Sequence, residues 1–161
     1  MTIFLQALTR PDLQALARSE VPPALVGRFA EGALPPDFVA ARALEHIRAG
    51  KPPQWCSTYY IVRQSDQVVV GGCGFKDAPA GGSVEIGYAV SPQCRKQGIA
   101  TAAVRALLQK AFASAEVQEV RAEIDLSNIA STRVVQKLDF EHCGTVVAGE
   151  DEPFGQWSRR R

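Results

Sequence analysis

The chain has 161 residues, of which 46% are hydrophobic and 22% are charged. This length and composition predict a single globular domain over residues 1–161 with one sizeable core. Eighteen basic and 17 acidic side chains give a formal net charge of +1. Such a balance lacks the basic field that general nucleic-acid binding requires, so we expect no nucleic-acid partner and interpret the C-terminal Arg-Arg-Arg run as a solvated tail.

No apolar run approaches the ~20 residues of a membrane span, and residues 1–8 lack the basic segment of a signal peptide. We therefore expect a cytoplasmic protein with no membrane partner. The four cysteines are widely spread without a C-x-x-C pair, and only two histidines accompany them. We expect neither a disulfide nor a metal site. Cys94 precedes a basic stretch that could activate a thiol, although a cysteine without a catalytic role is the favoured interpretation.

The N-terminal third predicts a strand followed by helices. Residues 3–8 alternate weakly between apolar and polar and indicate a first strand. A Thr-Arg-Pro-Asp run at residues 9–12 supplies an N-cap, a proline and an acidic side chain for a helix over residues 11–19. Two Pro-Pro pairs then divide residues 21–50 into two short helical stretches.

A three-stranded meander is predicted next. Residues 58–63 are rich in aromatic and β-branched side chains, and residues 68–75 complete a hairpin with them. The Gly71-Gly72 pair is not followed by a helix, so we interpret it as a bulge or close backbone packing rather than a phosphate loop. Residues 83–90 form the third strand.

The C-terminal part alternates strands and helices. Residues 119–126 alternate strictly and predict a strand with one polar face. Asn128 begins a helix, residues 140–147 form another strand, and a polar turn leads to a short final segment around Trp157. The predicted buried stripe of the helix is Ala130, Val134 and Leu138. Together these elements predict an α/β mixed sheet with helices on both faces.

The segment that organises the chain is residues 90–112, which pass from a strand end through a loop into an amphipathic helix. The apolar face of this helix contains Ala100, Val104, Leu107, Leu108 and Ala111. Gly98 lies where the loop becomes the helix and lets a ligand approach the backbone. The first-turn amides, aided by Arg95 and Lys96, predict a cradle for a phosphate or pyrophosphate. The alternative is an ordinary strand-to-helix turn.

Three ordered motifs resemble one family. Arg95-Lys96-Gln97-Gly98-Ile99-Ala100 fits the R/Q-x-x-G-x-G/A motif by which the GNAT superfamily of N-acetyltransferases binds the pyrophosphate of acetyl-CoA. Glu85-Ile86-Gly87-Tyr88 precedes it, and Asn128-Ile129-Ala130-Ser131 with Lys137-Leu138-Asp139-Phe140 follows it, in the manner of the RimJ/RimL-type branch. The resemblance covers roughly residues 58–157 well, and the N-terminal helices only by arrangement.

The resemblance implies a GNAT-like fold whose mostly antiparallel sheet splays open between the strands at residues 83–90 and 119–126. Acetyl-CoA would be the co-substrate, with no metal. Its pantetheine would bind the backbone of Ala89 and Val90, and Asn128 would reach it from the other side. The implied pyrophosphate site consists of Arg95, Lys96, Gln97, Gly98, Ile99, Ala100 and Thr101.

The resemblance also implies direct acetyl transfer to an amine. Glu85 is the candidate general base, and its alternative is a half-exposed strand carboxylate. Val135 stands where many relatives have a tyrosine acid, so Ser131 is the candidate acid unless it merely bonds back to the helix backbone. Asp139 replaces a glycine of the family pattern, and we expect it to adopt a left-handed backbone conformation at the helix end.

The acceptor is left open between a protein N-terminal amine and a small-molecule amine, and a homodimer is also left open. We expect residues 21–50 to form a wall of the acceptor site, with Phe38 and Arg42 exposed, unless Phe38 belongs to the core. Glu123 and Asp125 either attract a cationic acceptor or are ordinary surface charges. The alternative function is a CoA-binding regulatory or structural domain without turnover.

Overall fold

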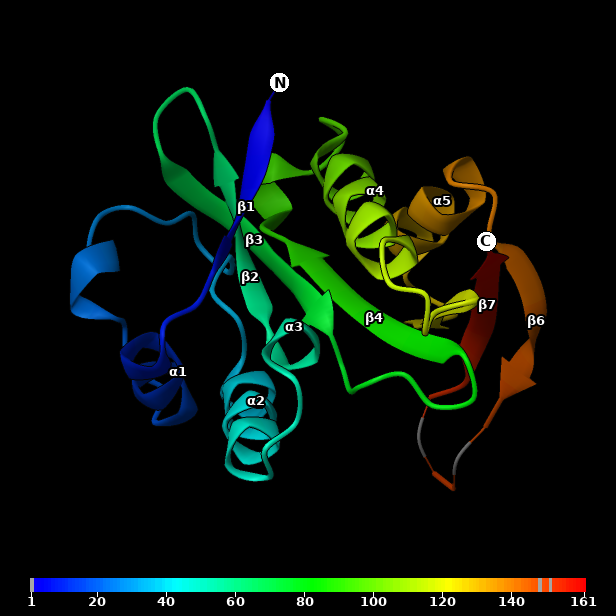
Figure 1. Ribbon diagram of the computed structural model, residues 1–161. Coiled ribbons are helices and arrows are strands. Elements are labelled where there is room, and N and C mark those ends of the chain that lie inside the picture. The colour runs from blue at the N-terminus through cyan, green and yellow to red at the C-terminus, as the bar shows by residue number, and fades with distance from the viewer. Residues whose placement is uncertain (1, 148, 151) are drawn as a thin grey trace.

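The computed structural model describes residues 2–147, 149–150 and 152–161 (Figure 1). Among them no helix has both the length and the apolar character needed to cross a membrane. In chain order the elements are β1 (Ile3–Ala7), α1 (Arg10–Ala17), η1 (Pro23–Leu25), α2 (Asp37–Arg48), α3 (Pro53–Cys56), β2 (Thr58–Arg63), β3 (Val68–Phe75), β4 (Ser83–Val90), η2 (Pro92–Cys94), α4 (Ile99–Phe112), β5 (Glu119–Asp125), α5 (Ile129–Lys137), β6 (Glu141–Val146) and β7 (Phe154–Arg160).

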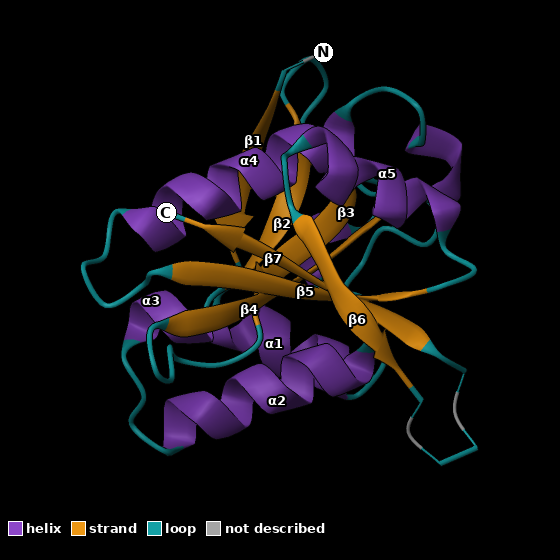
Figure 2. Cartoon of the chain, turned by 90° about the vertical axis from the view of Figure 1, so that its right-hand side faces the viewer, coloured by secondary structure: helices purple, strands orange, loops and turns teal. Residues whose placement is uncertain are grey.

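A seven-stranded sheet in the order β1-β2-β3-β4-β5-β7-β6 forms the centre of the molecule. The described strands pair antiparallel except for β4 and β5, which run parallel. Helices α4 and α5 cover one face, and α1, α2 and α3 lie on the other (Figure 2). The predicted α/β mixed sheet with helices on both faces is confirmed.

Each face of the sheet has its own hydrophobic cluster. The larger lies under α4 and α5, where Val104, Leu107 and Ala111 are fully buried. Leu108 is also buried and Ala100 packs against the same cluster, so the predicted apolar face of α4 is confirmed. The smaller cluster joins α1 and α2 to the opposite face of β2 and β3. Helix α4 is therefore held against the sheet along its length, which fixes the position of its N-terminus.

The glycines of β3 allow neighbouring backbones to pack closely. A Cβ on Gly71 would collide with the carbonyl oxygen of Ala89 on β4, and one on Gly74 would lie 2.8 Å from the carbonyl oxygen of Ser57. The pairing of β2 with β3 also shifts register between Ile61 and Val62. Close backbone packing with a nearby bulge, rather than a phosphate loop, is thus confirmed for the Gly-Gly pair.

The N-terminal half departs from the prediction in two places. The first helical stretch expected within residues 21–50 is only the single 3-10 turn η1, because Gly27 with φ 75° ends the segment a few residues after Pro23. The second stretch is confirmed as α2. The one-turn helix α3, which begins directly at the proline pair of residues 52–53, was not predicted.

The C-terminal segment also differs from the prediction. The segment around Trp157 is the strand β7, which enters the sheet between β5 and β6. The interpretation of the Arg-Arg-Arg run as a solvated tail is wrong. Arg159 donates a hydrogen bond to the carbonyl oxygen of Leu138 at 2.7 Å, and Arg161 donates to three carbonyls at the end of α4 and in the loop after it. These donors satisfy carbonyls that a helix end leaves unpaired.

Helix α5 has the predicted ends but a different buried face. Asn128 Oδ1 accepts a hydrogen bond from the Ser131 amide at 3.1 Å, which caps the helix. Ala130 is exposed, contrary to the predicted stripe, and Val135 is fully buried in its place. Asp139 has φ 62°, and the amides of residues 139 and 140 bond back to Gln136 and Val135. The expected left-handed conformation of Asp139 is confirmed, within a Schellman motif.

Candidate functional site

Strands β4 and β5 separate halfway along their length. Their parallel pairing runs from Ser83 opposite Glu119 to Ile86 opposite Ala122 and then stops. Beyond that point β4 stays paired with β3, and β5 with β7. The predicted V-shaped opening is therefore present, and the edge of β4 that faces it offers backbone groups to an extended ligand.

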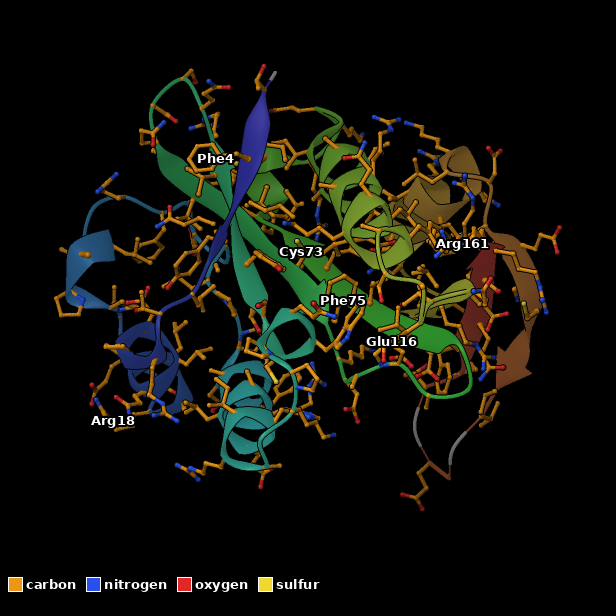
Figure 3. The ribbon with its side chains drawn as sticks, in the orientation of Figure 1. Phe4, Arg18, Cys73, Phe75, Glu116 and Arg161 are labelled. Carbon is orange, nitrogen blue, oxygen red and sulfur yellow. The ribbon has the colours of Figure 1, made fainter. Side chains whose placement is uncertain are left out.

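A cavity of about 390 Å³ occupies this opening. Its walls come from β3, β4 and β5, from α2 with the loop before it, and from the start of α5. Cys73 and Phe75 of β3, which line it, lie near the centre of Figure 3. The polar and charged lining side chains are Arg42, Thr58, Lys76, Tyr88, Glu123, Asp125, Asn128 and Ser131. A concave site with a few converging polar groups is the usual form of a small-ligand pocket.

The predicted site residues fall into three groups in the structure. Ala89, Asn128 and Ser131 line the cavity. Val90 does not line the cavity but ends the strand β4, and residues 95–101, which do not line it either, form the loop before α4 and the start of that helix. Glu85 does not line it either. The sequence interpretation assigned no role to Tyr88 or Lys76, because strand alternation alone does not show that β4 and β5 part at this level.

The loop before α4 has the geometry of an anion site. Gly98 has φ 77° and precedes the first helical residue without a side-chain cap. A Cβ there would meet no protein atom within 4 Å. Within the part of the chain that the structure describes, the amides of residues 98–101 have no protein acceptor, and the exposed Arg95 and Lys96 form no salt bridge. Free amides, a helix dipole and two cations together can hold a phosphate group.

Lys96 itself has φ 62°, a left-handed conformation that costs a residue with a Cβ about 1–2 kcal/mol. Two left-handed residues, Lys96 and Gly98, thus lie within three positions of the loop. Alternation of this kind turns successive amides toward one concavity, a geometry that binds anions. The conformation of the loop therefore supports the same ligand chemistry as its charge.

Glu85 is half-buried on β4 and forms an ion pair with Lys76, the residue that follows β3. In the sheet it is the register partner of Arg121 on β5. The Lys76 side chain lines the cavity while that of Glu85 does not. The carboxylate is thus held by a cavity residue and can reach the opening only through that residue or through water.

Tyr88 joins the two sides of the opening. Its hydroxyl donates a hydrogen bond of 2.9 Å to the carbonyl oxygen of Ser131 in the first turn of α5. Burial raises the pKa of Tyr88 above its ordinary value. The Ser131 hydroxyl makes no hydrogen bond within the described residues, whereas Thr132 bonds back to the Asn128 carbonyl. The Ser131 hydroxyl is therefore available to a ligand.

Helix α2 contributes the wall opposite α5. Phe38, Val39 and Arg42 line the cavity from this helix; Phe38 is 65% exposed, and Arg42 is half-buried rather than fully exposed. The alternative that Phe38 belongs to the core is therefore wrong. Glu123 and Asp125 line the cavity from β5 and are exposed, so both a surface position and a place beside the cavity apply to them. Hydrogen bonds from Ser127 hold the pKa of Asp125 below its ordinary value.

We next consider the cysteines and the side chains that could bind a metal ion. In the part of the chain that is described, no group of three or more His, Cys, Asp or Glu side chains could hold a metal ion. Cys94 is a free thiol, 5% exposed, within the larger hydrophobic cluster. Its burial supports the interpretation of a cysteine without a catalytic role.

Comparison with known proteins gives the same architecture. The family model of the acetyltransferase (GNAT) domain matches residues 2–141. The curated N-acetyltransferase YjdG of Bacillus subtilis (strain 168) is 30% identical over 84 residues, which are 52% of this chain and 50% of YjdG. The match therefore spans about half the length of that relative.

Two solved structures are similar over almost the whole chain. RimL, a ribosomal L7/L12 alpha-N-protein acetyltransferase in complex with coenzyme A, has a TM-score of 0.70 at 18% identity, covering 99% of this chain and 94% of RimL. The aminoglycoside acetyltransferase AAC(6')-Ib in complex with coenzyme A has a TM-score of 0.68 at 21% identity, covering 99% of this chain and 95% of that one. With the matched domain, the splayed parallel strands and the amide-rich loop before α4, the chain belongs to the GNAT acetyltransferase domain family.

Proposed function

We propose that this protein is an acetyl-CoA-dependent N-acetyltransferase that moves the acetyl group directly to a primary amine bound in the same cavity. The proposal rests on one observation: β4 connects two features that can each bind part of a ligand. Its splayed edge borders the cavity, and the loop after it presents the free amides before α4. One extended molecule with a phosphate end and an amide-containing arm fits both.

The residues present fit this co-substrate. Residues 95–101 would hold its pyrophosphate, and the backbone of Ala89 and Val90 would pair with the pantetheine arm. Open space beside Gly98 permits close approach to the backbone. Asn128 uses Oδ1 to cap α5, so its amide nitrogen is the group that can reach the arm. The thioester brings an activated acetyl group, and the protein orients it.

The acid and base roles proposed for the chain follow from the cavity lining. Glu85, held by Lys76, would accept the proton of the amine through a water molecule. Ser131 would hydrogen-bond the departing sulfur with its unpaired hydroxyl. Because Val135 carries no hydroxyl and is fully buried, that position cannot supply the acid.

The acceptor is a primary amine, of either a protein or a small molecule. The two similar structures are named for a ribosomal protein and for aminoglycosides, which are one acceptor of each kind. A RimJ/RimL-type protein N-terminal amine is the candidate that the N-x-x-S motif favours, and Glu123 and Asp125 would attract its cationic form. A cytoplasmic location stays a prediction, and a homodimer stays open.

The experiment that tests the proposed function measures free thiol released from acetyl-CoA with a panel of peptides, polyamines and aminoglycosides. Acetyl-CoA at 100 times its dissociation constant should also stabilise the fold by about 2.7 kcal/mol, which raises the melting temperature by roughly 5–11 °C. Glu85→Gln should lower turnover without weakening acetyl-CoA binding. The exposed Glu116→Gln, remote from the cavity lining, is the control and should keep the wild-type rate.

The second candidate function is that of a CoA-binding domain without turnover. One observation favours it: Val135 provides no hydroxyl at the position where an acid was expected. The same two measurements separate the alternatives. A melting shift without thiol release for any acceptor would support the regulatory domain, and the absence of both would contradict any CoA-binding role.

Substitutions on α2 should change recognition of the acceptor alone. Phe38→Ala should raise the acceptor KM roughly tenfold, since burying part of a phenylalanine ring is worth about 1.4 kcal/mol, and Arg42→Ala should change KM most for acceptors with an anionic group. Melting temperature and acetyl-CoA affinity should stay near wild-type values because neither side chain belongs to the buried core. Val26→Ala, at a position 70% exposed outside the cavity lining, is the control. An unaltered KM for Phe38→Ala across the panel would remove α2 from the acceptor site.

A further inference from the structure

Tyr88 lines the cavity but has no role in the acid and base steps proposed for Glu85 and Ser131. It lies on the part of β4 that has left β5, and its ring packs partly against the larger hydrophobic cluster. Its hydroxyl crosses the opening to the Ser131 carbonyl at 2.9 Å. The phenol is therefore held at the first turn of α5, beside the side chains of Asn128 and Ser131 that also line the cavity.

Acetyl transfer from a thioester leaves a thiolate that needs a proton, so the cavity must contain a proton donor. The other titratable and charged groups that line it serve poorly. Glu123 and Asp125 are carboxylates, which carry no proton near neutral pH unless strongly perturbed. Arg42 does not release its proton in proteins, and Lys76 is bound to Glu85.

The remaining candidates are a thiol and three hydroxyls, those of Thr58, Tyr88 and Ser131. The Cys73 side chain lies on β3 within the larger hydrophobic cluster, with only 4% of its surface exposed, so its thiol is poorly placed to reach a ligand. The hydroxyls of Thr58 and Ser131 are alcohols, whereas a tyrosine hydroxyl is a phenol with an ordinary pKa near 10. The phenol is thus the strongest acid of the three hydroxyls, and it is already positioned by a hydrogen bond that a better acceptor can replace.

We infer that Tyr88 is the general acid of this enzyme, donating its phenolic proton to the departing thiol sulfur, an inference that rests on the proposed N-acetyltransferase function. The amine nitrogen bonds to the acetyl carbon, the carbon–sulfur bond breaks, and the sulfur takes the proton of Tyr88. The amine gives up one proton on becoming an amide; Glu85 accepts this proton through water and then passes it, again through water, to the Tyr88 oxygen. Ser131 positions the phenol through its carbonyl.

Two further features agree with this role. Burial of the phenol favours its protonated form, the form that an acid requires. The fully buried Val135 on α5 lies one helical turn from Ser131, so the phenol of Tyr88 reaches the same turn of α5 from the opposite strand. A tyrosine that approaches from β4 can supply the chemistry that α5 itself lacks.

The test begins with Tyr88→Phe, which removes the hydroxyl and keeps the ring. We expect kcat to fall about 100-fold or more with an acceptor on which the wild type is active, while acetyl-CoA affinity is unchanged. Tyr60→Phe is the matched control, because it also loses a single 2.9 Å hydrogen bond, to Asp12, but lies outside the cavity lining. It should keep the wild-type kcat.

A second measurement distinguishes an acid from a purely structural role of the Tyr88 hydroxyl. Incorporation of 3,5-difluorotyrosine at position 88 keeps the hydrogen bond but lowers the phenol pKa. An acid is lost as pH rises through its pKa, so the alkaline limb of kcat should move to lower pH in this protein. If the alkaline limb of kcat did not move, the assignment would be overturned. It would also be overturned if Ser131→Ala lowered kcat 100-fold while Tyr88→Phe kept the wild-type kcat.

The outcomes also separate this inference from the function on which it rests. A wild type that releases thiol, together with an equally active Tyr88→Phe variant, overturns the role of Tyr88 alone. A wild type that binds acetyl-CoA but releases no thiol with any amine overturns both.

Discussion

Gly98→Leu should weaken acetyl-CoA binding at least about tenfold, a loss of about 1.4 kcal/mol. The residue has φ 77°, and the space where a Cβ would project contains no protein atom within 4 Å. In the proposed complex this space is the approach of the pyrophosphate to the free amides before α4, so a leucine side chain blocks the ligand rather than the protein. Calorimetric titration with acetyl-CoA measures the effect.

The control for Gly98→Leu must reproduce its backbone strain. Gly27 has φ 75°, and a Cβ added there would likewise meet no protein atom within 4 Å, but this residue lies in the loop after η1, away from α4. Gly27→Leu should lower the melting temperature about as much and leave acetyl-CoA affinity unchanged. Equal affinities for both variants and the wild type would show that residues 95–101 are not the pyrophosphate site.

Leu107→Ala should destabilise the fold by about 2–5 kcal/mol, the range for a buried leucine that leaves a cavity. Its side chain is fully buried in the larger hydrophobic cluster, on the face of α4 that packs on the sheet. For a chain of this length the melting temperature should fall by roughly 4–20 °C, which thermal unfolding by circular dichroism measures.

Phe38→Ala provides the contrast for Leu107→Ala. It removes a larger side chain, but one that is 65% exposed, so it should cost within about 0.5 kcal/mol. A loss below about 1 kcal/mol for Leu107→Ala would mean that α4 is not anchored as the structure shows. Because the cradle lies at the N-terminus of this helix, its placement relative to β4 depends on that anchoring.

The division between the two halves of the molecule has a functional consequence. The larger cluster holds β4, β5, α4 and α5, which carry or flank the residues proposed to bind the co-substrate. The smaller cluster holds α1 and α2, and only α2 and its preceding loop reach the cavity. Changes in α2 should therefore alter the proposed acceptor wall at little cost to the proposed co-substrate site.

Local chemistry was sufficient to predict several elements from the sequence. The bounds of β2, β3 and β4 agree with their predicted ranges because alternation and β-branched content report directly on strands. The apolar face of α4, the place of Gly98 where the loop becomes the helix and the left-handed Asp139 also follow from neighbours within a few residues. The loop proposed to bind an anion is such a local feature, because its charges and amides alone suggest the ligand.

Long-range pairing decided the rest. Residues 154–160 became a strand because β5 and β6 both lacked a partner on one edge, and the short, charged segment shows no strong pattern by itself. For the same reason Arg159 and Arg161 bind carbonyls that lie 21 to 49 positions earlier in the chain, where a sequence interpretation saw only a solvated tail.

The composition of the cavity also depends on tertiary structure. The point at which β4 leaves β5 is set by packing against β3 and β7, and it determines that Tyr88 meets α5 and that Lys76, not Glu85, lines the opening. The sequence by itself therefore determined the strand-loop-helix unit proposed to receive a phosphate, because its amides and charges are local. Only the tertiary structure decided which side chains surround the reacting groups, because they come from separate elements whose approach no local pattern encodes.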